Sequence, residues 1–315
     1  MKYIPNLIFF ILYCTYSFGQ QSIDGNFAFQ NNPAKKYSLY IPSSYNAQVP
    51  NDAMLALHPL NTNRWDSQSW RDTLIAFAEE NNLILIAPDG GIDGRIDDPI
   101  DTAFTSALID STMKWYNIDE QQVFVMGFSW GGKTTYTYGL RRINQFAGFM
   151  IINPAVNLSE VNGIIENANN KAFYLIHGSN DSPGVRYFPF VDALNANNAC
   201  LETEYMQGIG HTIDFPNRNQ ILSNAFSFLK ANNCSTTSTS NSFISNLNVY
   251  PNPSKGRIFF DKSIENSSIK IFSSNGQALA FHKAENYIEI SCDPQMVFLY
   301  IVDGQSIDVK KILIH

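Results

Sequence analysis

The chain carries little charge and no surplus of positive charge. Only 16% of its 315 residues are charged, and 28 acidic residues outnumber 21 basic ones, for a formal net charge of −7. Binding to nucleic acid or to an anionic membrane surface depends on basic surface, so this balance excludes both as expected partners. Hydrophobic residues nevertheless make up 44% of the chain, which predicts a folded protein with a large core.

Hydrophobic runs long enough to span a membrane are not expected either. The apolar run at residues 7–13 follows the basic Lys2 and precedes Ser17-Phe18-Gly19, which contains two small residues. It is too short to cross a bilayer, and its flanks are those of a secretory signal peptide. We therefore expect residues 1–19 to be a signal peptide that is removed before Gln20, without stable membrane insertion. A buried amino-terminal helix is the alternative.

Cysteine is scarce, and Cys200, Cys234 and Cys292 do not have the spacing of a metal site. Cys14 lies within the predicted signal. Export would place the other three in a compartment where disulfides persist. A bond between Cys200 and Cys234 would tie the last helix of the first domain back to a strand, but the sequence leaves its formation open, and Cys292 has no obvious mate. We expect no metal and no organic cofactor.

Short apolar runs alternate with helical stretches from Lys36 to Met206, which is typical of a parallel sheet covered on both faces. Strands are expected at 37–41, 53–58, 83–88, 123–126, 149–152, 172–177 and 202–207. Helices are expected at 70–81, 105–116, 133–142 and 217–231. The sequence therefore predicts an α/β fold with a doubly wound, mostly parallel sheet over residues 20–232.

The composition changes after residue 232. Residues 233–245 are mostly Ser, Thr and Asn, which cannot bury a core and therefore indicate a flexible linker. Beyond them apolar and polar residues alternate, with turn signals at Asn275-Gly276 and Asp303-Gly304. We expect residues 246–315 to form a small all-β domain, an Ig-like antiparallel sandwich.

A motif for a nucleophile stands between a strand and a helix. Residues 123–132 read Val-Phe-Val-Met-Gly-Phe-Ser-Trp-Gly-Gly, a G-x-S-x-G sequence between an apolar run and a helical stretch. This context is typical of a nucleophile elbow, in which a tight turn presents Ser129 at the amino end of a helix. Larger side chains at positions 127 and 131 would collide with neighbouring backbone. An ordinary surface turn is the alternative.

A serine nucleophile needs a histidine base, because a hydroxyl keeps its proton at neutral pH. The first domain holds three histidines. His211 lies in a glycine-flanked loop after the last expected strand, from which it can reach across to Ser129. His58 and His177 each end a strand, and we interpret them as structural residues. The sequence therefore predicts His211 as the base.

The acid of such a triad orients the histidine, and in enzymes with this elbow it lies between the serine and the histidine in the chain. Asp181 meets this requirement, since it lies on the loop after the strand at 172–177. Asp214 is the alternative, but it is only three residues from His211 and is better suited to cap the following helix. We therefore expect Asp181 to be the acid.

An oxyanion hole needs two N–H donors that point at developing negative charge. The main-chain N–H of Trp130, the residue after the nucleophile, is one expected donor. The other is expected from the loop after the strand at 53–58. Because Pro59 has no N–H, Leu60 or Asn61 is the candidate there.

Several segments between residues 36 and 229 match one known group of enzymes. They are 36–42, 57–58, 87–90, 116–119, 127–132, 177–181 and 210–211. In these segments the first domain resembles the polyhydroxybutyrate depolymerase and feruloyl esterase group of the α/β-hydrolase superfamily. The resemblance implies that Ser129, Asp181 and His211 are catalytic. The chain departs from the group after His58, where glycine is usual, and at residues 182–185, where the loop is one residue longer.

The second domain has Val-Tyr-Pro-Asn-Pro at 249–253, a following Gly256, an apolar strand at 298–301 and a basic ending at 310–315. It is similar to the C-terminal sorting domain of the type IX secretion system of Gram-negative bacteria. The resemblance implies contact with that secretion machinery, removal of the sorting domain, and a secreted or cell-surface location. A carbohydrate-binding module is the alternative for a small β-domain behind such a linker.

Together these features predict a secreted serine esterase that works through an acyl-enzyme. Expected substrates are feruloyl or acetyl esters of polysaccharide, polyhydroxyalkanoate-type polyester, or small esters. Trp65, Trp70 and Trp130 are candidates for an aromatic-binding surface, although burial explains each equally well. The alternatives are a secreted serine peptidase of the same fold and a catalytically silent surface-binding protein.

Overall fold

The computed structural model describes residues 19–29, 32–61, 64–231, 247–265, 267–274, 276–303 and 306–315. Nearly all of the predicted signal peptide, the whole predicted linker and one residue of each predicted turn signal lie outside these ranges. Cys200 is disulfide-bonded, but Cys234 also lies outside them, so the pairing of the two stays a prediction. Cys292 is a free thiol.

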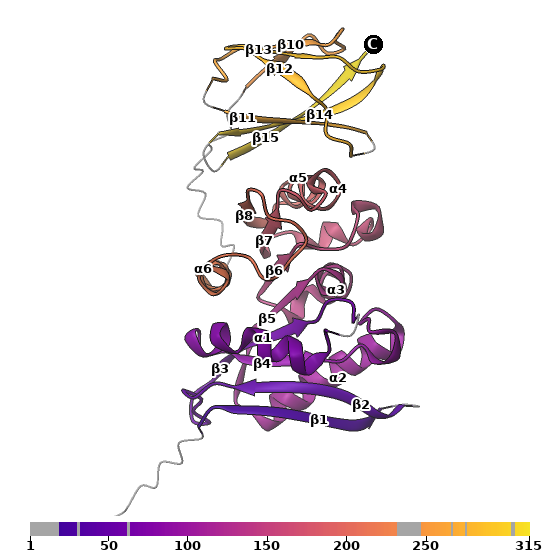
Figure 1. Cartoon of the computed structure of the whole chain (residues 1–315). Coiled ribbons are helices and arrows are strands. Elements are labelled where there is room, and N and C mark those ends of the chain that lie inside the picture. Colours follow the sequence, from indigo (N-terminus) through magenta and orange to yellow (C-terminus); the bar gives the residue numbers. More distant parts are fainter. Residues whose placement is uncertain are drawn as a thin grey trace, which may run out of the picture.

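One sheet of eight strands organises residues 19–231 (Figure 1). Its strands are β1 (Gln21–Phe29), β2 (Asn32–Ile41), β3 (Asn51–Leu57), β4 (Ile84–Pro88), β5 (Ile118–Phe128), β6 (Gly148–Ile152), β7 (Ala172–Gly178) and β8 (Cys200–Met206). Their spatial order is β1-β2-β4-β3-β5-β6-β7-β8. All pairs from β4 to β8 are parallel, whereas β2 pairs antiparallel with β1 and β4. The predicted mostly parallel sheet is confirmed, and β1 is a strand that the sequence did not reveal.

Helices cover both faces of this sheet. They are α1 (Ser67–Glu80), α2 (Pro99–Trp115), α3 (Trp130–Gly139), α4 (Pro183–Arg186), α5 (Phe188–Ala196) and α6 (Arg218–Ala231), with short 3₁₀ helices at Gly91–Asp93, Leu140–Gln145, Leu158–Val161 and Ile165–Ala168. The helix α2 begins earlier than predicted, because the Asp98 side chain caps it by accepting from the Asp101 N–H. The helix α5 was not predicted.

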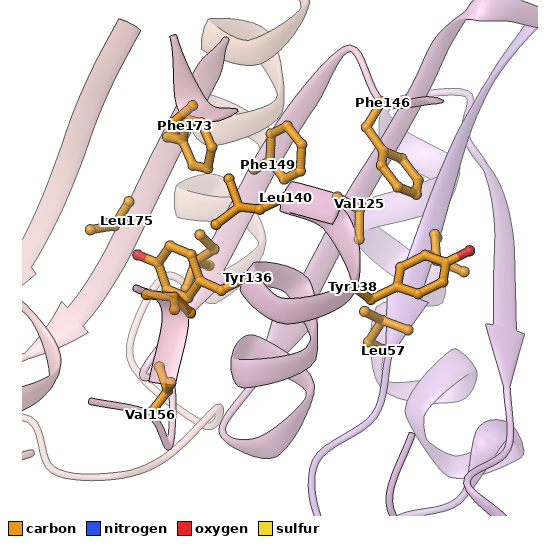
Figure 2. Close-up of a cluster of buried hydrophobic side chains, with 14 of the residues drawn as sticks. Leu57, Val125, Tyr136, Tyr138, Leu140, Phe146, Phe149, Val156, Phe173 and Leu175 are labelled. Carbon is orange, nitrogen blue, oxygen red and sulfur yellow. The ribbon is translucent and has the colours of Figure 1, made fainter. Parts of the chain in front are cut away.

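Two buried cores lie on opposite faces of the sheet. Successive residues of a strand point to opposite faces, so Leu55 and Leu57 belong to one core while Met54 and Ala56 belong to the other. The first core contains residues of α2, α3 and α5, and the second contains residues of α1 and α6. Figure 2 shows part of the first core, where side chains of α3 pack among those of the strands. This double burial fixes the strand ends that carry the candidate site.

Residues 247–315 form two antiparallel sheets. Their strands are β9 (Val249–Tyr250), β10 (Arg257–Phe260), β11 (Ser268–Ser273), β12 (Phe281–Lys283), β13 (Tyr287–Ile290), β14 (Gln295–Asp303) and β15 (Ser306–Ile314). The sheet orders are β12-β13-β10-β9 and β11-β14-β15. Ile258 of the first sheet and Leu299 of the second belong to one buried core. The predicted small all-β domain is confirmed, whereas an Ig-like topology stays a prediction.

The two units meet at α5 and β8. The ring of Phe188 lies against Tyr300 with centroids 3.8 Å apart, and Lys270 Nζ donates to Tyr205 Oη at 3.0 Å. A cavity of about 570 Å³ lies beside this contact, lined by residues of α4, α5, β11, β14 and β15 and of the segments next to them. None of Ser129, Asp181 and His211 lines this cavity, so we do not assign it to the chemistry of the candidate triad.

Two kinds of feature are absent from the described ranges. No helix there is long and apolar enough to cross a membrane. No group of three or more His, Cys, Asp or Glu side chains in the same ranges is arranged to hold a metal ion.

Candidate active site

Ser129 lies on a strained turn between β5 and α3. Its φ of 57° and ψ of −114° are costly for a residue with a side chain. The neighbouring main chain holds this turn in place. The Ser129 N–H donates to the Ile152 carbonyl at 3.0 Å, and the Ser129 carbonyl accepts from the N–H groups of Lys133 at 3.1 Å and Ala155 at 2.8 Å. The structure thus has the strand, turn and helix that the motif predicted.

The turn excludes side chains at positions 127 and 131. A Cβ on Gly131 would lie 2.0 Å from the Leu57 carbonyl oxygen, and a Cβ on Gly127 would lie 2.2 Å from the Gly131 carbonyl oxygen. Both distances are far inside van der Waals contact, and both neighbours are main-chain atoms. The predicted collision is therefore confirmed, and the glycines let α3 start close against β3.

Three side chains that are distant in the sequence converge at this turn. His211 Nε2 lies 2.7 Å from Ser129 Oγ, and His211 Nδ1 lies 2.7 Å from Asp181 Oδ2. A neutral imidazole with its proton on Nδ1 would donate to the carboxylate and accept from the hydroxyl. In that arrangement the serine can pass its proton to the histidine when it attacks. The structure therefore brings together the three residues that the sequence singled out.

The Asp181 carboxylate is buried, and its two oxygens have different partners. Its side chain is only 4% exposed. While Oδ2 faces His211, Oδ1 accepts from Arg186 Nη1 at 2.9 Å. The Asp181 main-chain carbonyl also accepts from His177 Nε2 at 3.0 Å. Since a buried charge is costly unless it is paired, these contacts stabilise the carboxylate in one orientation. The sequence analysis did not single out Arg186.

The alternative acid, Asp214, is engaged elsewhere. Its side chain is half exposed and forms ion pairs with Arg64 at 2.8 Å and with Arg218, the first residue of α6, at 3.3 Å. These pairs hold the loop after His211 against its surroundings. The geometry therefore favours Asp181 as the partner of the imidazole.

His58 and His177 are buried and each holds a loop. His58 Nε2 accepts from the Gly90 N–H at 2.9 Å, and its Nδ1 lies 2.6 Å from the Pro59 carbonyl oxygen. His177 holds the Asp181 carbonyl. Burial lowers the pKa of His58, and it lowers the pKa of His177 to about 4. Both imidazoles are therefore neutral at pH 7, which agrees with their interpretation as structural residues.

Two residues that the sequence analysis did not single out position His211. The Phe128 ring lies 5.1 Å from the imidazole and 6.3 Å from the Trp70 ring, so it packs between the two. The Asn153 side chain donates to the Thr212 carbonyl at 2.9 Å and accepts from the main chain at the end of β7. Phe128 could have been found from the sequence, because it directly precedes the nucleophile. No pattern in the sequence indicates Asn153.

The structure separates the two candidates for the second oxyanion donor. The main-chain N–H of Asn61 donates to the Gly94 carbonyl at 3.2 Å. Because this contact already uses the Asn61 N–H, the structure favours the Leu60 N–H as the second oxyanion donor. The N–H of Trp130 lies in the first turn of α3, where main-chain donors lack an intrahelical acceptor. The main-chain N–H groups of Trp130 and Leu60 are therefore the candidate oxyanion donors.

Of the three tryptophans near the site, two belong to the core. Trp65 is 8% exposed and Trp70 is fully buried. Trp130 is only partly buried, its Nε1 donates to Asp97 at 3.0 Å, and the Arg95 guanidinium lies 4.5 Å from its ring centroid. Burial thus accounts for Trp65 and Trp70, and Trp130 remains a candidate for contact with substrate.

The second unit matches a known family. Residues 248–315 match the family described as the secretion system C-terminal sorting domain. The sequence-based prediction of a sorting domain is therefore confirmed. Such a domain marks the protein for export, either to the cell surface or into the medium.

The first unit is similar to feruloyl esterases and other serine hydrolases. A probable feruloyl esterase C of Aspergillus oryzae is 27% identical over 184 residues, which are 54% of this chain and 64% of the relative. The chain thus spans less than two thirds of the length of that curated relative.

Solved structures show the same fold at low sequence identity. A fluorophosphonate-binding serine hydrolase of Staphylococcus aureus has a TM-score of 0.56 at 17% identity, covering 67% of this chain and 98% of its own. A chain from Bacteroides ovatus described as a dipeptidyl aminopeptidase IV has a TM-score of 0.57 at 11% identity, covering 70% of this chain and 37% of its own. The first unit therefore has the α/β-hydrolase fold.

The glycines of the turn provide a test of its packing. Gly131→Ala is expected to lower the free energy of unfolding by about 3 kcal/mol, because the new methyl group meets the Leu57 carbonyl. Urea denaturation would measure the loss. Gly210→Ala is the matched control, since a Cβ there has nothing within 4 Å. Equal stabilities of the two variants would contradict the proposed packing.

Burial of His177 predicts a loss of stability in acid. Its folded-state pKa of about 4 lies below the ordinary histidine value of 6.5, so the unfolded chain binds more protons between these pH values. The free energy of unfolding should therefore fall as the pH drops from about 6.5 to 4, by up to about 3 kcal/mol from this residue. Urea denaturation across that range should give a flatter profile for His177→Gln. Parallel profiles for both proteins would refute this account.

Proposed function

We propose that this chain is an exported serine hydrolase that cleaves carboxylic esters through an acyl-enzyme. The observation that carries the proposal is the unbroken chain of short contacts from Ser129 Oγ through His211 to Asp181. His211 takes the proton of Ser129 as the oxygen attacks the ester carbonyl carbon, and Asp181 stabilises the resulting imidazolium. These three side chains act as nucleophile, base and orienting acid.

The oxyanion site and the proton on His211 complete the first half of the reaction. Negative charge on the carbonyl oxygen is stabilised by the main-chain N–H groups of Trp130 and Leu60. His211 then gives its proton to the leaving alkoxide, and the alcohol departs. In the second half His211 deprotonates water, which attacks the acyl-enzyme. The tetrahedral intermediate that forms then collapses, which releases the carboxylic acid, and His211 returns its proton to Ser129.

The substrate class follows from the relatives and from export. Similarity to proteins named feruloyl esterase supports esters of aromatic acids, and export supports a substrate outside the cell. We propose feruloyl or acetyl esters on polysaccharide as the first candidates, with polyhydroxyalkanoate-type polyester and small esters next. Trp130 follows the nucleophile in the chain, and its indole is partly exposed, although Arg95 and Lys133 lie 4.5 and 4.6 Å from its ring centroid. An aromatic acyl group could contact the exposed part of this side chain.

Two rival functions use the same fold. A serine peptidase is the first, and the likeness to a chain described as a dipeptidyl aminopeptidase shows that the fold alone does not separate them. Sequence similarity to feruloyl esterases favours the ester. A catalytically silent binding protein is the second, and the formed contacts of Ser129, His211 and Asp181 favour an enzyme.

The rest of the chain serves export in this proposal. Residues 1–19 are a signal peptide that directs crossing of the inner membrane, and residues 233–245 are a linker. Residues 246–315 form an Ig-like sandwich that engages the type IX secretion machinery and is then removed. The match of residues 248–315 to a sorting domain supports this assignment.

Loss of the nucleophile tests the function directly. Ser129→Ala should lower turnover of a chromogenic short-chain ester by at least about 10⁴-fold, while the urea denaturation curve stays close to that of the parent. The exposed Ser22 on β1 provides a matched control, and Ser22→Ala should keep full turnover. Undiminished ester turnover by Ser129→Ala would contradict the assignment of Ser129 as the nucleophile. If the parent protein cleaved a peptide substrate faster than the ester, the result would favour the peptidase.

Processing of the exported protein tests its proposed route. Amino-terminal sequencing of material from the surface or medium of a type IX-competent host should begin at Gln20. The mass of that material should also lack the residues of the sorting domain. Retention of Met1 or of an intact carboxyl end in exported protein would contradict the corresponding step.

A further inference from the structure

The acid of the candidate triad has a cation as its second partner. Arg186 is the last residue of α4, five residues after Asp181 in the chain. Its Nη1 donates to Asp181 Oδ1 at 2.9 Å, while Asp181 Oδ2 lies 2.7 Å from His211 Nδ1. The carboxylate is 4% exposed and the arginine side chain 33% exposed. Each oxygen of a buried carboxylate thus has its own donor, and one donor is a permanent positive charge.

We propose that Arg186 is a positioning residue for the catalytic acid, which holds the Asp181 carboxylate in register with His211 and offsets its negative charge. The inference rests on the proposed function, because it concerns the base of that reaction. It adds a fourth side chain to the three that the sequence singled out. Arg186 does not touch the reacting atoms and acts only through Asp181.

Charge is the first part of the argument. A carboxylate beside an imidazole stabilises the protonated ring, and a cation on the far side of that carboxylate opposes this effect. Asp181 is buried, whereas the side chains of Arg186 and His211 are 33% and 37% exposed, so solvent screens part of the interaction between them. Removal of the Arg186 charge is therefore expected to favour the protonated ring of His211, which cannot accept the serine proton. The enzyme should keep its active form to lower pH than it would without this arginine.

Geometry is the second part. The terminal torsion of an aspartate is broad, so a carboxylate with one partner can rotate about it. The guanidinium holds Oδ1, and the His177 imidazole holds the main-chain carbonyl of the same residue. With Oδ1 fixed, Oδ2 stays directed at His211. Residues 183–185 belong to the same short helix, α4, as this arginine.

The other groups around His211 do not offset the charge of Asp181. His177, from β7, is neutral at pH 7 because burial lowers its pKa to about 4. Asp214, on the loop after His211, is paired with Arg64 and Arg218. The strand β5 contributes the apolar ring of Phe128 rather than a charge.

The test separates charge from hydrogen bonding. Arg186→Gln keeps a donor for Asp181 but removes the charge, Arg186→Met removes both, and Arg186→Lys keeps the charge. Arg257→Gln is the control, since that arginine forms an exposed pair with Glu289 in the second unit. The readout is kcat and KM for a chromogenic ester from pH 4.5 to 8.5, with urea denaturation of each variant.

The charge-removing variants should move the acid limb of the pH profile upward by about 0.5–1 unit. Their kcat at pH 5.5 should fall by about 3- to 10-fold with KM nearly unchanged, since the neutral base is less populated. Arg186→Met should also lose activity at its pH optimum, because Oδ1 lacks a donor. Arg186→Lys and Arg257→Gln should keep the acid limb of the parent.

An unshifted acid limb in both Arg186→Gln and Arg186→Met would overturn the inference, even if their activity fell, because a merely structural role would not move the limb. The His211 imidazole can also be titrated by NMR on histidine-labelled protein, which requires no turnover. An upward shift there in Arg186→Gln, in a parent that hydrolyses no ester, would support the inference while refuting the proposed function. If the His211 titrations of the parent and of Arg186→Gln coincided, the inference would be overturned, whether or not the protein hydrolyses esters.

Discussion

The positive-φ backbone of Ser129 is the constraint on which the site depends. This conformation is unfavourable for a serine, and it persists because three main-chain hydrogen bonds and two glycines without room for a Cβ surround it. The turn lies between a strand buried on both faces and a helix packed into the core, so it has no freedom to relax. The strain has a chemical consequence, because the turn directs the hydroxyl out of the sheet and toward His211.

The parallel sheet explains why distant residues meet at that hydroxyl. Ser129 follows β5, Asp181 follows β7 and His211 follows β8, and carboxyl ends of parallel strands lie at one edge of a sheet. The loops at this edge are then fixed by buried polar contacts. His177 holds the acid, Asn153 holds the loop of the base, and His58 holds the loop of the second oxyanion donor.

The sequence carried the strand ends and the three central side chains, because apolar runs and a G-x-S-x-G turn are local patterns. It did not reveal β1, whose residues Gln21–Phe29 alternate at an antiparallel edge with few apolar members, or α5, which is short and begins Phe-Pro-Phe. The sequence also did not predict the contact of Arg186 with Asp181 or the hydrogen bond from the Asn61 N–H to Gly94. Each depends on which loops the fold brings together, and no spacing in the chain encodes that.

The most direct measurement of the central claim is a crystal structure of the protein after reaction with a fluorophosphonate. The account predicts density continuous with Ser129 Oγ. It also predicts a phosphoryl oxygen within hydrogen-bonding distance of the main-chain nitrogens of Trp130 and Leu60. An adduct on another residue, or a phosphoryl oxygen that meets neither nitrogen, would contradict it.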